Sequence, residues 1–291
     1  MIANTVLLSV TLFTGGVDRF IRFYLISAAM AGLVAVVPIF IALLPAIFFQ
    51  VHLIDPTNII LSTLDTVGYL ALMFTTTVIA TDRFVLFLLP MVHKFLSDTV
   101  WISPCFAILP WIITTLATIH MNIIGCYKRT DPYALTFTYA CSECSYYDPI
   151  LYTSGYVFPG IASFLYLIIY CRIVSTRLKF RSTMKQIPTV CHTNYKAQDV
   201  SLVLQFFLIC ALQLGTSALF YILPPLTGGT TISYQIPMVF SVMNTMVNPM
   251  VIFIFQKRIR HRCFTILKVL SQRVDVSRSR VKQLDVMMHH Q

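Results

Sequence analysis

Six long apolar segments constrain the fold of this chain more than any other feature of its sequence. A helix needs about 20 mostly apolar residues to cross a bilayer, and six segments reach that length: 24–49, 58–80, 100–124, 149–174, 200–224 and 233–255. A seventh apolar stretch, 1–14, is too short to cross unaided, and it lacks the basic start and the cleavage site of a signal peptide. The sequence therefore predicts an all-α membrane protein.

The charged residues are few, and their placement predicts an orientation. Only 11% of the 291 residues are charged, whereas a soluble domain has roughly 25%. The net charge of +10 would suggest nucleic acid, but with the loop after segment 58–80 in the cytoplasm, every basic residue except Lys128 and Arg129 lies on the cytoplasmic side. We therefore expect a multi-pass protein of the plasma membrane with a cytoplasmic C-terminus, surrounded by lipid and without a nucleic-acid partner.

The connections between the segments are short, except for an external loop at 125–148 and a cytoplasmic loop at 175–199. Beyond the last segment, residues 257–270 alternate basic and apolar side chains at helical spacing, which predicts an amphipathic helix on the cytoplasmic membrane surface. Cys263 in this helix is a candidate for lipidation, with an unmodified buried thiol as the alternative. Residues 271–291 are expected to form a disordered cytoplasmic tail.

Other classes of membrane protein need features that the sequence lacks. An enzyme would need a catalytic cluster, but His52, His120 and Asp65 are scattered, and neither His-Glu-x-x-His nor Gly-x-Ser-x-Gly occurs. A transporter would show repeated halves with broken helices, and the sequence contains no internal repeat. We therefore expect no enzyme activity, no metal and no cofactor, and a membrane transporter is the alternative from another class.

A charged pair closes the second of the six segments. Asp82 and Arg83 follow it directly, Pro90 comes seven residues after the arginine, and Trp111 lies within the next segment. Charges at that depth need partners or water. In type and spacing these residues resemble the Asp-Arg-Tyr region of the rhodopsin family of G-protein-coupled receptors, with Phe84 in place of the tyrosine.

The last segment carries a second motif that resembles the same family. Asn248 and Pro249, with Asn244 one turn earlier, are similar to its Asn-Pro-x-x-Tyr motif, although Ile252 replaces the tyrosine. A proline in a membrane helix permits a kink, and asparagines on one face hydrogen-bond to neighbours or to water; a kinked packing helix is the alternative reading. Tyr170 resembles the inner tyrosine of the family's fifth helix.

The resemblance implies a seven-transmembrane helix bundle over residues 1–270. Asn4 is placed like the asparagine in the middle of the family's first helix, so that helix is expected to be truncated, with about half of it preceding Met1. The resemblance also implies a small-molecule ligand, a heterotrimeric G protein as partner, and activation in which the sixth helix moves away from Arg83. The residues expected to carry coupling and activation are Asp82, Arg83, Tyr170, Asn244, Asn248 and Pro249.

The sequence departs from the family most in the sixth helix. After Cys210, Ala211 and Gln213 replace the usual tryptophan and proline. Gln213 is either a ligand contact or an interhelical hydrogen-bond partner. In the second helix, Gly32 replaces the acid that holds a sodium ion in relatives, so we expect no sodium site.

Asp65 is an acidic residue deep in the apolar segments, and a buried carboxylate must be paired, neutralised or solvated. In the amine receptors of the family, an aspartate at this distance from the motif arginine is the counter-ion of the ligand, and Tyr69, one turn deeper, is placed to add a cation–π contact. Three alternatives stay open: a cationic ligand, an internal polar pair, or a different polar ligand. The candidate ligand-binding residues are Asp65, Tyr69, Gln213 and Tyr234.

The external loop contains Cys126, Cys141 and Cys144, which face an oxidising compartment. The family usually ties this loop to the third helix by a disulfide, but Asn58 stands where the partner cysteine would be. The resemblance therefore implies a bridge within the loop, from Cys126 to either Cys141 or Cys144. This loop and the altered sixth helix resemble the serpentine chemoreceptors of nematodes, especially class x. Chemosensory, olfaction-like detection of a small molecule is thus expected; a neurotransmitter or peptide receptor is the alternative within the family.

Overall fold

The structure is a computed structural model of the chain. It describes residues 1–13, 19–50, 53–99, 101–131, 136–139, 144, 147–183, 197–228, 230–255, 260–261 and 263–265.

Helices make up nearly all of the described structure. In chain order they are α1 (Ile2–Phe13), α2 (Arg19–Pro38), the π-helix η1 (Ile39–Leu43), α3 (Leu44–Phe49), α4 (Thr57–Leu88), α5 (Pro90–Asp98), α6 (Ile102–Ile123), α7 (Tyr147–Thr183), α8 (Ala197–Leu226) and α9 (Thr231–Phe255). Two short strands, β1 (Arg129–Asp131) and β2 (Thr136–Thr138), form an antiparallel hairpin between α6 and α7. Within the described residues, six helical spans are long and apolar enough to cross a membrane, and α1 is apolar but has only 12 residues.

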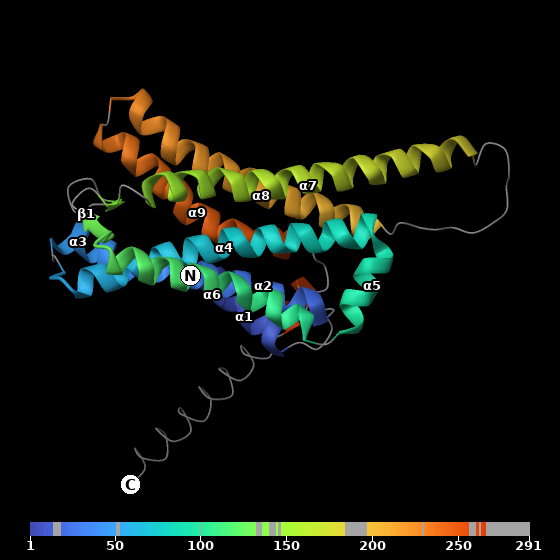
Figure 1. Cartoon of the computed structure of the whole chain (residues 1–291), viewed down its shortest axis with the longest axis horizontal. Helices are drawn as coiled ribbons and strands as arrows, with labels where there is room; N and C mark the ends of the chain where they lie inside the picture. The colour runs from blue at the N-terminus through green and yellow to red at the C-terminus, as the bar shows by residue number, and fades with distance from the viewer. Residues whose placement is uncertain are drawn as a thin grey trace, which may run out of the picture.

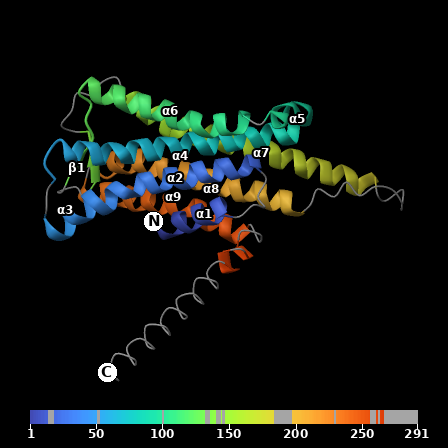
Figure 2. The same ribbon diagram turned by 90° about the horizontal axis from the view of Figure 1, so that it is seen from below.

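The long helices lie side by side along the long axis of the molecule (Figure 1). The β1–β2 hairpin and α3 lie at one end of this bundle, which we call the hairpin end, and α5 lies at the other, the α5 end; Figure 2 shows the same arrangement from below. α4 is the central helix, because it packs against α2, α6 and α7.

Several helices extend beyond the expected segments. α4 continues past Ala80 to Leu88 because Phe84, Phe87 and Leu88 pack against the apolar core. α5 occupies what was expected to be a short turn, and α7 runs on to Thr183, into the expected 175–199 loop. α7 thus ends beyond the point at which the apolar pattern stops, since a helix does not need apolar residues to continue past the bilayer.

Close packing between α2 and α4 depends on one glycine. A Cβ atom at Gly68 would lie 2.4 Å from the backbone nitrogen of Ala35, well inside contact distance, so only glycine allows the two helices to come this close. A polar contact adds to this packing at Ser27, whose Oγ lies 3.2 Å from Thr75 Oγ1 and 3.0 Å from the Trp111 indole nitrogen and donates to the Ala107 carbonyl at 3.1 Å. Ser27 thereby ties α2 to both α4 and α6.

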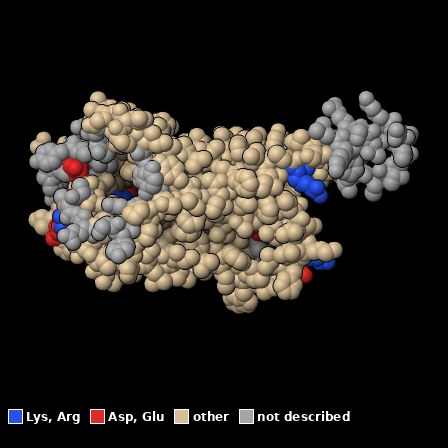
Figure 3. Space-filling model, turned by 45° about the horizontal axis from the view of Figure 1, so that its top comes forward, with Lys and Arg blue, Asp and Glu red and all other residues tan. Residues whose placement is uncertain are grey.

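The surface of the bundle is apolar between its ends. On the face shown in Figure 3, the charged side chains gather near the two ends and the flank between them is almost wholly uncharged. On α6, Ile108, Ile112 and Leu116 are 54%, 51% and 62% exposed along one face, as expected for side chains that meet lipid. The chain is thus a multi-pass membrane protein.

The predicted amphipathic helix at 257–270 falls mostly outside the described residues, which include only 260–261 and 263–265 of it, in helical conformation. The predicted tail at 271–291 lies outside them altogether.

Candidate functional site

The β1–β2 hairpin caps one end of the bundle. Arg129 pairs with Thr138, Thr130 with Phe137 and Asp131 with Thr136. Because the side chains of successive strand residues point to opposite faces, Phe137 is directed to one face of the hairpin and its neighbours to the other. Phe137 is 7% exposed and packs against Ile39 and Leu43 of η1 and Met238 of α9. The hairpin therefore packs onto this end of the bundle.

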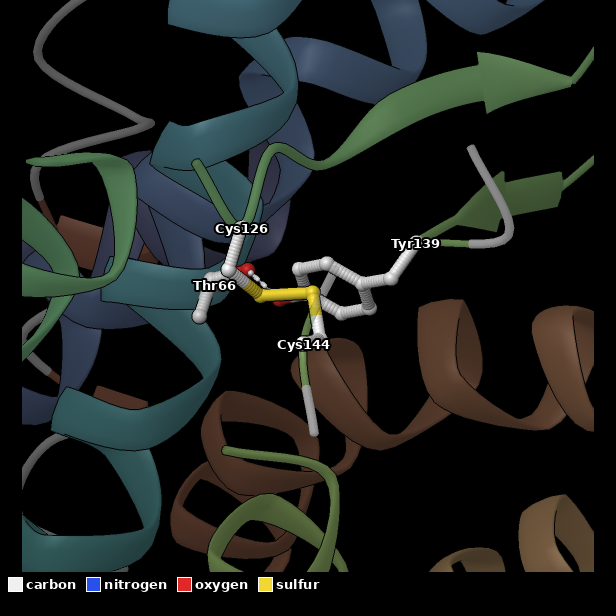
Figure 4. The surroundings of a disulfide bond; sticks show 4 residues. All are labelled: Thr66, Cys126, Tyr139 and Cys144. Carbon is white, nitrogen blue, oxygen red and sulfur yellow. Dashed lines mark hydrogen bonds between the residues drawn. A yellow bond between two sulfur atoms is a disulfide. The ribbon is translucent and has the colours of Figure 1, made fainter. Parts of the chain in front are cut away.

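A disulfide joins Cys126 and Cys144, with an S–S distance of 2.03 Å. Of the two pairings that the sequence left open, the structure has this one; Cys141 lies outside the described residues. The bond connects the end of α6 to the start of α7 and packs against Tyr139, Tyr147 and Met121. Figure 4 shows the disulfide beside Thr66 of α4 and Tyr139 of the hairpin.

Hydrogen bonds fasten the hairpin to α4. Asn58 Oδ1 accepts from the backbone nitrogen of Thr130 at 3.2 Å and from its hydroxyl at 2.7 Å. Two turns further along α4, Thr66 Oγ1 and the Tyr139 hydroxyl share a hydrogen bond of 2.9 Å (Figure 4). Asn58, which stands where the resemblance would place a cysteine, thus holds the loop without a covalent bond.

Asp65 forms an ion pair with Lys128, which lies just before β1. The two side chains are 15% and 14% exposed, and the Lys128 ammonium lies 5.1 Å from the centre of the Phe137 ring and 5.8 Å from that of Tyr139. Burial acts to lower the pKa of Lys128, but the neighbouring Asp65 carboxylate and Tyr139 outweigh it, so the pKa is raised and the ammonium stays charged. Among the three alternatives for Asp65, the structure contains the internal polar pair.

The remaining candidate ligand contacts are engaged between helices. The Tyr69 hydroxyl shares a 3.1 Å hydrogen bond with Ser217 of α8. Gln213 is fully buried, with its Oε1 3.0 Å from the Thr76 hydroxyl, while its Nε2 has no hydrogen-bond partner in the described part of the chain. This is the interhelical arrangement that the sequence left open for Gln213. The side chain of Tyr234 lies outside the description.

At the α5 end, Asp82 and Arg83 are both largely buried. Arg83 is 7% exposed, and its Nη2 lies 3.7 Å from Asp82 Oδ2. His93 of α5 places its Nε2 3.7 Å from Asp82 Oδ1. Neither Arg83 Nε nor Asp82 Oδ2 has a hydrogen-bond partner among the described residues, so this pair is looser than the one at the hairpin end.

Tyr166, rather than Tyr170, faces this pair. Tyr170 is 47% exposed on the outer side of α7, whereas Tyr166, one turn earlier, is fully buried in the core and close enough to Asp82 and Arg83 to interact with them electrostatically. Tyr170 therefore does not face Arg83, because the helix directs its side chain outward, and its role in coupling stays a prediction. The spacing from Pro159 is a signal for this: the resemblance would place the tyrosine about eight residues after that proline, and Tyr166 lies seven residues after it whereas Tyr170 lies eleven.

α9 packs against α1 and α2. Ile252, one turn after Asn248, packs against Leu7 and Leu25. Asn4 Nδ2 donates to the Thr245 carbonyl at 3.0 Å, and a Cβ atom at Gly32 would lie 2.9 Å from that same nitrogen. The small residue at position 32 thus makes room for Asn4.

Two side-chain amides of α9 lack hydrogen-bond partners for some of their atoms. Asn248 and Asn244 are 5% and 4% exposed, and neither amide atom of Asn248 nor Oδ1 of Asn244 has a partner in the part of the chain described. Pro249 follows within α9, where it removes one backbone donor. The arrangement leaves buried polar atoms that water or a rearranged neighbour would have to satisfy.

Cys263 packs against the apolar cluster that contains Leu7, Val10 and Ile252. Burial raises the pKa of its thiol, which reduces the thiolate that acylation requires. Its lipidation stays a prediction. Among the described residues, no three His, Cys, Asp or Glu side chains are grouped as metal ligands.

Comparison with known proteins identifies the fold. No protein-family model matches the chain, and no curated protein matches it either. Among solved structures, the chain is similar to squid rhodopsin with a TM-score of 0.72 and 15% sequence identity, over 92% of this chain and 81% of the rhodopsin chain. The architecture is therefore a rhodopsin-like seven-transmembrane helix bundle, with six membrane-length helices and the shorter α1.

Proposed function

We propose that this protein is a G-protein-coupled receptor, not an enzyme, which detects a small molecule and signals to a heterotrimeric G protein. The observation that supports this most is the buried Asp82–Arg83 pair at the α5 end of a rhodopsin-like bundle. A buried guanidinium with an unpaired donor is costly. A partner that reaches Arg83 would satisfy that donor, and a transporter gives no comparable reason for it.

Exposure of Arg83 to a partner would require α8 to move. Ile209 and Cys210 of α8 belong to the same buried cluster as Ile79 and Ala80 of α4 and Tyr166 of α7. Movement of α8 away from α4 would open this cluster and expose Arg83 at the α5 end. A ligand bound at the hairpin end would drive this movement by binding the opened arrangement more tightly than the closed one.

We infer a chemosensory role from the departures within the sequence. Ala211 and Gln213 remove the large aromatic and the kink of the sixth helix, and the external loop resembles that of nematode serpentine chemoreceptors of class x. The distribution of basic residues supports an orientation with the α5 end and the C-terminus in the cytoplasm. A receptor for external small molecules would lie in the plasma membrane.

Nucleotide exchange tests the proposal. Membranes from cells expressing the protein, mixed with purified heterotrimeric G proteins and a panel of small molecules, should show guanine-nucleotide exchange above that of membranes without it. Arg83→Ala should remove this exchange at unchanged surface level, by tenfold or more, since it deletes the group that the G protein would contact. Arg172→Ala, an exposed arginine of α7, is the matched control and should keep it. Exchange that is equal with and without the protein, or unchanged in Arg83→Ala, would contradict the receptor function.

A further inference from the structure

The surroundings of Lys128 have the composition of a binding site for an organic ammonium ion. The Asp65 carboxylate contacts the ammonium directly, and the rings of Phe137 and Tyr139 lie 5.1 and 5.8 Å from it. A carboxylate together with aromatic faces is the combination that recognises amines. Here the amine belongs to the chain itself.

We propose that Lys128 is a built-in occupant of this ammonium site and thereby determines specificity: it keeps free organic monocations out, so that a ligand of the hairpin end is uncharged where it approaches Asp65. That such a ligand is uncharged near Asp65 rests on the proposed receptor function, whereas the occupancy of the site by Lys128 does not. Removal of the Lys128 side chain would turn the site into one that accepts a free alkylammonium ion.

The chain gives its own lysine an advantage over any free amine. Lys128 stands between Cys126, fixed by the disulfide, and Thr130, held by Asn58. An ammonium held this close has an effective concentration in the millimolar range or above. A free amine would also have to expel a charged side chain that is only 14% exposed. Competition therefore favours the resident lysine at ordinary ligand concentrations.

The other charged pair of the hairpin provides a matched comparison. Arg129 Nη2 lies 2.8 Å from Asp55 Oδ2, but these side chains are 36% and 42% exposed. Both pairs join a basic residue of the loop to an acid on the chain that forms the hairpin end of α4: Asp55 just before the helix, and Asp65 about two turns inside it. Of these two pairs, only the one with Lys128 combines burial with ring contacts among the described residues. Removal of the Lys128 side chain, but not of the Arg129 side chain, should therefore create a site for a free amine.

Chemical rescue in the purified protein tests the inference. Lys128→Ala, in detergent, should gain a saturable rise in unfolding temperature on addition of n-butylammonium, of about 3 °C at ten times the dissociation constant. The same concentrations of n-butanol, which has the chain without the charge, should have little effect. Wild type, Arg129→Ala and the double variant Lys128→Ala/Asp65→Asn should show no saturable rise.

Each outcome of this experiment either supports or overturns the inference. Equal stabilisation of wild type and Lys128→Ala would show that Lys128 does not fill the site, and no stabilisation of a folded Lys128→Ala would show that the pair is structural only. If Lys128→Ala fails to fold alone, Lys128→Met with methylammonium replaces it; recovery in the presence of either amine supports the inference, and failure of both variants to respond overturns it. The readout involves no G protein, so a failed receptor function and a failed ammonium site are distinguishable.

Discussion

The two ends of the bundle differ in how completely their buried polar groups are paired. At the hairpin end, Asn58, Asp65 and Thr66 of α4 each have a partner on the external loop. At the α5 end, the Asp82–Arg83 contact is 3.7 Å long and leaves polar atoms of both residues without a partner in the described structure.

Gln205 of α8 extends this difference. It is fully buried, about two turns from Gln213 toward the start of α8, and neither of its amide atoms has a partner among the described residues. Unpaired buried polar atoms raise the energy of the arrangement that holds them. We therefore expect the hairpin end to contribute more to stability, whereas the α5 end can gain hydrogen bonds by rearranging.

The largest effect should come from breaking the hairpin end. Asp65→Ala leaves the Lys128 ammonium buried without its carboxylate, which should cost about 3 kcal/mol of unfolding free energy. Asp55→Ala, which removes the acid of the exposed pair with Arg129, should cost about 0.5 kcal/mol. Unfolding temperatures of the purified variants in detergent measure both. Equal losses would show that burial does not distinguish the two pairs.

Toward the α5 end, we expect a substitution that raises the unfolding free energy instead of lowering it. Gln205→Leu replaces an unpaired amide by an apolar side chain of similar size, and should stabilise the protein by about 1 kcal/mol. Gln213→Leu should gain less, because the Gln213 carbonyl lies within hydrogen-bond distance of Thr76. Thermal unfolding of the two variants checks the ranking, and a loss of stability in Gln205→Leu would mean that its amide has partners after all.

The smallest effect concerns pH. The pKa of Lys128 is raised from an ordinary value of 10.5, so the contribution of its charge is fully present below that value and is lost only as the pH rises through the raised pKa. The stability difference between wild type and Lys128→Met/Asp65→Leu, which lacks both charges, should therefore stay constant from about pH 7 to 10. A difference that already declines near pH 8 would place the lysine outside the ion pair.

The apolar segments could be predicted from the sequence because bilayer thickness fixes how long an apolar helix must be. The rhodopsin-like architecture was predicted from the resemblance of Asp82-Arg83 and Asn248-Pro249 to motifs of that family, and the fold confirms it. Helix ends were less accessible: α4 runs to Leu88 because Phe84 and Phe87 find core neighbours, which a hydropathy pattern does not report. The same limit applies to Tyr170. A hydropathy pattern does not report that Tyr166, one turn earlier in α7, is the tyrosine that faces Arg83.

The partner of Asp65 could not be predicted from local patterns. Those patterns relate residues three or four apart on a helix, whereas Lys128 comes 63 positions later in the chain and reaches Asp65 only because the loop folds back over the bundle. The sequence established that Asp65 needed a partner, and the folded loop determined which one it has. The same long-range folding brings Thr130 to Asn58.

The way in which Asn58 holds the loop has a consequence for redox chemistry. The Cys126–Cys144 bond joins the end of α6 to the start of α7. The contacts that the structure describes between the loop and α4 are hydrogen bonds and the Lys128–Asp65 ion pair. A reducing agent that cuts this disulfide therefore loosens the junction between α6 and α7 but leaves the contacts to α4 chemically intact. In this protein, reduction of the disulfide therefore does not by itself detach the loop from α4.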